Sequence, residues 1–81
     1  MISCADYDYI EIVCMFQYPV ALTLKSGAVK VGTAVDTAKN ADREECIKIK
    51  VEDNHELVAL DTIAKLEVLV ANPHFKVVCF S

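Results

Sequence analysis

The fold of this chain is decided near its start, by the stretch Cys4-Ala-Asp-Tyr-Asp-Tyr-Ile-Glu-Ile-Val-Cys14. At about 100° per residue, one arc of a helix over this stretch collects apolar side chains, namely Tyr9, Ile10, Val13, Cys14 and Phe16. We expect this arc to pack on the rest of the protein. Ser3 is the expected N-cap. Tyr18-Pro19 is expected to end the helix, because the residue before a proline avoids the α region.

The opposite side of the predicted helix is acidic. Asp8, Glu11 and Met15 follow one another at spacings of three and four, so they should form one ridge. Tyr7 flanks that ridge, and Asp6 lies in the first turn, where a carboxylate suits the positive end of the helix. The first twenty residues hold three acids and no Lys or Arg, and so carry −3 of the formal net charge of −4.

Composition limits the classes of protein that this chain can belong to. Its 81 residues make one domain, residues 1–81, and 54% are hydrophobic, so a globular core is expected. No apolar run reaches the roughly 18 residues of a membrane span. The start of the chain lacks the basic and apolar regions of a signal peptide, so a cytoplasmic location is expected.

The spacing of the four cysteines indicates neither a metal site nor a disulfide framework. They show no CxxC spacing, and the two histidines, His55 and His74, lie far apart in sequence. We interpret Cys14, Cys46 and Cys79 as small, partly buried hydrophobic residues. Neither histidine has an obvious Ser, Cys or orienting acid nearby, and no Gly-rich phosphate loop is present, so no enzyme activity and no cofactor are predicted.

After the helix, alternating apolar and polar residues predict short strands over residues 20–25, 28–36, 45–52, 56–60, 64–70 and 75–80. The residues expected to face inward are Val20, Leu22, Leu24, Val29, Val31, Val35, Ile47, Ile49, Val51, Leu66, Val68 and Val70. Ser26-Gly27 and Asp53-Asn54 are expected turns, and Gly32 indicates a bend or a close backbone approach. Residues 37–43 are expected to form an exposed loop, and 61–63 a single helical turn capped by Asp61.

One helix and five or six short strands, without room for crossover helices, predict an antiparallel barrel or sandwich. The last strand, residues 75–80, is expected to close an edge of the sheet. The fold class is therefore mainly β, with an N-terminal helix.

Seven positions in the first block carry a family resemblance: Ile2, Cys4, Asp6, Tyr7, Asp8, Glu11 and Cys14. Together with Leu22-Thr23-Leu24, Ser26-Gly27 and residues 60–63, they resemble the Rho-binding antiterminator (Rof) family of bacteria. The resemblance covers most of the chain. It implies an Sm-like fold, with an N-terminal helix and a strongly bent five-stranded barrel, to which this chain adds a C-terminal strand.

The resemblance also implies a function: binding to the hexameric transcription termination factor Rho and blocking of its primary RNA-binding site. Carried onto this sequence, the implied contact residues are Asp8 and Glu11, with Asp6 and Tyr7 as neighbours. Met15 joins them because it shares the ridge, and the pair Lys39-Asn40 is a weaker transfer that matches in general position only. The free protein is expected to be a monomer.

Two other functions remain open at this point. An Sm-like RNA-binding module could assemble as a homo-oligomeric ring, and a purely structural homo-oligomer would bind neither Rho nor RNA. The net charge of −4 and the pI of about 4.9 argue against direct RNA binding, because phosphate binding favours a positive surface. The acidic balance favours a basic partner instead.

Overall fold

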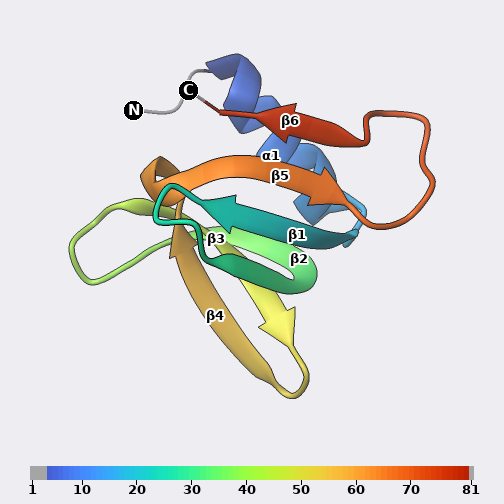
Figure 1. Ribbon diagram of the computed structural model, residues 1–81. Coiled ribbons are helices and arrows are strands. Elements are labelled where there is room, and N and C mark those ends of the chain that lie inside the picture. Colours follow the sequence, from blue (N-terminus) through green and yellow to red (C-terminus); the bar gives the residue numbers. More distant parts are fainter. Residues whose placement is uncertain (1–3, 81) are drawn as a thin grey trace.

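The computed structural model describes residues 4–80, with side chains from Tyr7 onward, and consists of one helix followed by an antiparallel sheet (Figure 1). The elements are α1 (Cys4–Met15), β1 (Pro19–Leu24), β2 (Val29–Lys39), β3 (Glu45–Val51), β4 (Asn54–Ala59), a 3₁₀ turn η1 (Leu60–Thr62), β5 (Ile63–Val68) and β6 (Val77–Cys79). The six strands lie in the order β4-β3-β2-β1-β5-β6. The predicted architecture of a helix and a six-stranded antiparallel sheet is confirmed. The expected cap Ser3 lies outside the described residues.

The helix ends by a backbone motif that precedes the proline. The Tyr18 N–H donates to the Val13 carbonyl at 3.0 Å, and the Gln17 N–H donates to the Cys14 carbonyl at 3.2 Å. Gln17 has a positive φ of 52°, so the pair of bonds forms a Schellman motif. This motif ends α1 at Met15, so the helix has already ended before the chain reaches Tyr18-Pro19, the predicted stop.

The second strand changes partners halfway along its length. Residues 29–33 of β2 pair with β1, and residues 33–39 pair with β3, with a register shift between Ala34 and Asp36 that leaves Val35 in a bulge. Gly32 lies just before this bulge, where a Cβ would come within 2.8 Å of the Lys50 carbonyl oxygen. The predicted close backbone approach at Gly32 is confirmed, and it lets β2 turn from one half of the sheet to the other.

The predicted inward face of β2 is wrong at its start. Val29 and Val31 are 59% and 54% exposed. In the register with β1, Gly32 lies opposite the buried Val20, and Lys30 opposite the buried Leu22. Cross-strand partners share a face, so Lys30 and Gly32 lie on the inner side and the two valines on the outer side. Val35 is half-buried.

Other boundaries shift by a few residues. Residues 37–39 belong to β2, which leaves residues 40–44 as the connecting loop. The turn between β3 and β4 is Glu52-Asp53, one residue earlier than expected, with Glu52 at φ 57°. The residue at the N-cap of η1 is Ala59, which makes no side-chain cap bond, so the expected Asp61 cap is wrong. The final strand is only Val77–Cys79, and it pairs with β5 at one edge of the sheet as predicted.

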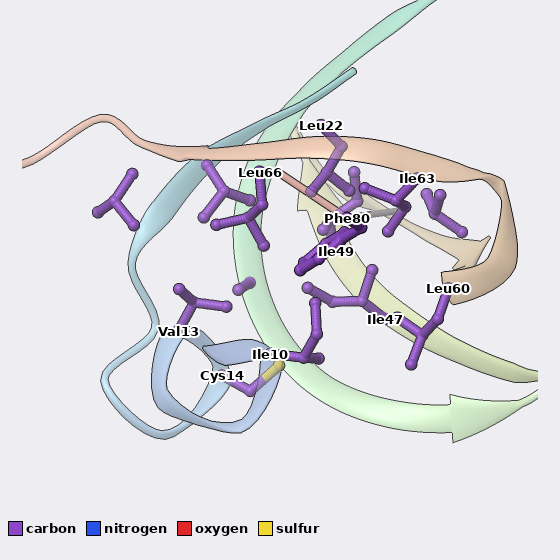
Figure 2. Close-up of a cluster of buried hydrophobic side chains, with 14 residues drawn as sticks. Ile10, Val13, Cys14, Leu22, Ile47, Ile49, Leu60, Ile63, Leu66 and Phe80 are labelled. Atoms are coloured by element: carbon purple, nitrogen blue, oxygen red, sulfur yellow. The ribbon is translucent and has the colours of Figure 1, made fainter. Parts of the chain in front are cut away.

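The core lies between α1 and the concave side of the sheet (Figure 2). The helix contributes Ile10 and Val13, both fully buried, and Cys14. The sheet contributes buried side chains from every long strand, among them Leu22, Ile47, Ile49, Val58, Ile63 and Leu66. Full burial of one such side chain contributes about 1.5–3 kcal/mol, so the helix is fixed mainly by these contacts.

Outside β2, most residues predicted to face inward are buried or half-buried, whereas Val70 and Cys79 are exposed. Val20, Leu22, Ile47, Ile49, Leu66 and Val68 are buried as predicted, and Leu24 and Val51 are half-buried. Val70 is 43% exposed, because β5 ends at Val68. Cys14 and Cys46 are buried free thiols as interpreted, whereas Cys79 is exposed on β6, the edge strand.

Candidate partner-binding surface

The outward side of α1 carries the residues that the sequence singles out. Asp8 and Glu11 are exposed, and Met15 is 72% exposed. We call these three residues the helix ridge. They point outward because Ile10, Val13 and Cys14, at complementary helical positions, are buried against the sheet. The predicted orientation of the ridge is therefore confirmed.

The two tyrosines of α1 differ from Asp8 and Glu11 in how they are held. Tyr7 and Tyr9 are both half-buried. Tyr7 packs against the hydrophobic core. Tyr9 contacts the ring of Phe75 edge to face, with ring centroids 4.7 Å apart. The side chain of Asp6 lies outside the described residues.

The acids of the ridge have no cationic partner within residues 7–80. The ion pair in that part of the chain joins Lys30 of β2 to Glu56 of β4, away from the ridge. No hydrogen bond or ion pair joins Asp8 or Glu11 to another described side chain. A basic partner could therefore pair with these carboxylates without first breaking an internal ion pair.

A groove lies beside the ridge, between α1 and the bulge of β2. Its volume is about 470 Å³, and it is lined by Glu11, Cys14, Met15, Val35, Asp36 and Thr37. Asp36 is exposed, and its Oδ1 accepts a hydrogen bond from the Thr37 N–H at 2.8 Å. The sequence alone does not point to this acid, because only the packing of α1 on β2 places it near Glu11.

The pKa of the Cys14 thiol depends on the charges around this groove. Burial raises its pKa from 9.0 to about 11, and the negative charges of Asp36 and Glu11 add to that rise. A thiolate would be a third negative charge beside two carboxylates. The groove lining therefore combines a neutral thiol, Cys14, with the carboxylates of Glu11 and Asp36.

Lys39 is the last residue of β2 and Asn40 the first of the following loop, and neither is joined to the ridge by a hydrogen bond or ion pair among the described side chains. Lys39 is exposed and pairs in the ladder with Glu45. The Asn40 Oδ1 accepts hydrogen bonds from the N–H groups of Asp42 and Glu44 at 2.9 and 3.0 Å. The Asn40 side chain thus holds the loop, and its Nδ2 donates to Glu44 Oε1 at 3.1 Å.

Exposed aromatic surface extends from the end of the helix. Phe16 is 49% exposed, although the sequence predicts it in the packed arc. The helix has already ended at Met15, so Phe16 no longer follows the helical period. Its ring stacks on Tyr18 and on His74, with centroid distances of 5.5 and 5.0 Å. Phe16 thus extends the exposed apolar surface of Met15 at the end of the helix ridge.

The described residues contain no group of three or more His, Cys, Asp or Glu side chains placed to hold a metal ion. Within the same part of the chain, no helix is both long and apolar enough to span a membrane. His55 and His74 are both exposed, on β4 and on the loop before β6 respectively.

The chain as a whole is similar to known proteins. Residues 1–80 match the family model described as modulator of Rho-dependent transcription termination (ROF). A search of curated proteins gives no match. Among solved structures, the chain is similar to one described as YaeO bound to magnesium from Vibrio cholerae O395. The two are 44% identical, the alignment covers 93% of this chain and 97% of that one, and the TM-score is 0.89.

Proposed function

This chain belongs to the family of modulators of Rho-dependent transcription termination, and from that premise we propose that it binds Rho and blocks the primary RNA-binding site of Rho through the acidic face of α1. It acts by binding, without catalysis and without a cofactor. The whole chain serves as one Rho-binding domain, and it works in the cytoplasm, where Rho acts on nascent RNA.

The observation that carries this proposal is the exposure of Asp8 and Glu11 without a cationic partner among the described residues. A protein surface that holds RNA presents lysines and arginines to the phosphates. Carboxylates on a rigid helix can pair with the same cations, and complementary charge also speeds the encounter. The buried Ile10 and Val13 hold the helix in place, so little order has to be gained on binding.

Neighbouring residues complete the proposed surface. Met15 supplies exposed apolar area beside the acids, and a methionine adapts easily to the shape of a partner. Asp6 and Tyr7, which precede Asp8 in the sequence of the helix, are further proposed contacts with Rho. Lys39 and Asn40 form a second contact, in which the hydrogen bonds of Asn40 keep the loop in one shape for Rho.

The free protein is proposed to be a monomer. A ring of copies would need strands with unpaired edges that meet between neighbours. The outer edge of β5 is already hydrogen-bonded to β6, through the pairs Lys65 with Cys79, Leu66 with Val78 and Glu67 with Val77. The edge strands that remain are β4 and the three-residue β6, and an edge as short as β6 offers few backbone groups to a neighbouring copy, which supports a monomer over the ring-forming RNA-binding module.

The direct test is displacement of RNA from Rho. Labelled oligo-C RNA bound to purified Rho is followed by fluorescence anisotropy while the wild-type protein is titrated in. Asp8→Asn/Glu11→Gln removes two charges with little change of shape. Glu52→Gln/Asp53→Asn removes two charges at the β3–β4 turn, which Figure 1 shows at the far end of the molecule from α1. Circular dichroism checks that each variant is folded.

Wild type and the turn variant should displace the RNA equally. The helix variant should need roughly thirtyfold more protein, because the loss of a desolvated charge pair costs about 2 kcal/mol or more. An exposed acid that contacts nothing would cost about zero. If wild-type protein leaves the RNA on Rho, blocking of the primary site is wrong. If it binds the labelled RNA itself, the RNA-binding alternative is favoured.

A further inference from the structure

We infer that the groove between α1 and the bulge of β2 receives one lysine or arginine side chain of the partner, with Glu11 and Asp36 as the two acids that bind its charged end. The inference rests on the proposed function, since it takes Rho as the basic partner. It adds Asp36 and Thr37, which lie on the sheet rather than on the helix, to the binding surface.

The groove exists because β2 is bulged at Val35. The register shift between Ala34 and Asp36 interrupts the regular alternation of β2 beside the helix. The bulge brings the Asp36 side chain to the rim that faces α1, where the groove is lined from the helix by Glu11, Cys14 and Met15. Glu11 and Asp36, which are 25 positions apart in sequence, thus line the same groove.

The charge of the groove suits a cation. Asp36 and Glu11 both act on the Cys14 thiol, which places the two negative charges around the same point. Neither carboxylate forms an ion pair with a lysine or arginine in the described part of the chain. The bond from the Thr37 N–H to Oδ1 of Asp36 holds that carboxylate in place and leaves its other oxygen available.

The lining is mostly polar, and its apolar part, from Met15 and Val35, favours a cation that carries a hydrocarbon chain. Met15 is 72% exposed, and Val35 is half-buried beside it. Lysine and arginine side chains carry three or four methylene groups below the charged end, and these groups pack well on apolar surface. A long basic side chain therefore matches both the lining and the rim, whereas an RNA phosphate would meet two negative charges.

The test compares two single substitutions that remove the same charge. Asp36→Asn keeps an oxygen that can accept the bond from the Thr37 N–H, so the local backbone is retained. Asp53→Asn does the same at the exposed β3–β4 turn. Binding of each intact protein to Rho is measured by titration calorimetry at two salt concentrations. We expect the Kd of Asp36→Asn to rise by about three- to tenfold, with a weaker salt dependence. Asp53→Asn should change the Kd by less than about twofold.

A double-mutant cycle then asks whether Asp36 and Glu11 bind the same group. If they do, the effects of Asp36→Asn and Glu11→Gln combine to less than their product, because either change alone already weakens the shared contact. Independent effects that multiply in full would overturn a shared cation, and equal Kd values for Asp36→Asn and Asp53→Asn would overturn the groove as a site. Both results would leave the proposed function intact. The proposed function fails only if wild-type protein does not bind Rho or does not displace RNA from it.

Discussion

Gly32 of β2 passes so close to Lys50 of β3 that a Cβ on Gly32 would lie 2.8 Å from the Lys50 carbonyl oxygen. The same Cβ would lie 3.1 Å from a methyl group of Val51. This approach occurs where β2 leaves β1 and begins to pair with β3. The bend that sets the sheet against α1 therefore depends on the absence of a side chain at Gly32.

Gly32→Ala should destabilise the protein by about 1–3 kcal/mol, because the added methyl group forces two paired strands apart. Urea unfolding followed by circular dichroism measures the change. Gly27→Ala is a useful comparison: a Cβ there meets nothing within 4 Å, but the φ of 97° disfavours any side chain and should cost about 1–2 kcal/mol. An unchanged midpoint for Gly32→Ala would show that the strands separate there at little cost.

Ile10→Ala and Met15→Ala should separate stability from binding. Ile10 is fully buried, so its truncation should cost about 2–5 kcal/mol of unfolding free energy. Met15 is largely exposed, so its truncation should change stability by less than about 0.5 kcal/mol while weakening binding to Rho. Thermal melts and titration calorimetry supply the two readouts. If the Met15→Ala protein binds Rho as tightly as the wild type, Met15 is not part of the Rho-binding surface.

Asn40→Ala should loosen the loop between β2 and β3. The substitution removes the two bonds to the N–H groups of Asp42 and Glu44 and the bond to the Glu44 side chain. Each such bond contributes about 0.5–1.5 kcal/mol, less where the groups are exposed to water. Amide hydrogen exchange over residues 40–45 should accelerate, and cleavage there by a protease should increase. The exposed Asp42→Ala, in the same loop, keeps the Asn40 acceptor and should leave exchange nearly unchanged.

The burial of Cys14 predicts a loss of stability at high pH. Its pKa rises from 9.0 to about 11 on folding, chiefly through burial. Below pH 9 the thiol is protonated in both states, so its contribution is fully present. Between pH 9 and 11 the unfolded chain ionises first, which favours unfolding, and above about pH 11 no further loss follows. Urea midpoints of wild type and Cys14→Ala should therefore converge over this range. A constant gap between the two would contradict a raised pKa.

Thiol labelling checks the same burial independently. Because thiolates are the reactive form, iodoacetamide at pH 8 should modify the exposed Cys79 well before Cys14 or Cys46. Mass spectrometry of peptides resolves the three positions. Cys46 serves as an internal control, since burial raises its pKa as well. Equal labelling of Cys14 and Cys79 in the folded protein would mean that the helix opens readily.

The sequence by itself determined the helix and the direction of its two faces. The positions of Ile10, Val13, Asp8 and Glu11 within 3.6-residue turns decide which side is apolar and which is acidic, whatever the helix packs on. In the same way, alternation over residues 45–52 predicted a strand with Ile47 and Ile49 inward, and the structure has β3 at Glu45–Val51. These features are local, because the backbone geometry of one segment sets their period.

Only the tertiary structure decided which way β2 faces and what its bulge meets. Val29, Val31 and Val35 have a period of two that fits either face of a sheet, and the pairing of Val20 with Gly32 turned the first two valines outward. Asp36 reaches Glu11 only because the bulge lies under α1. Register and the meeting of distant segments depend on the free energy of the whole packed core, which no single stretch of sequence contains.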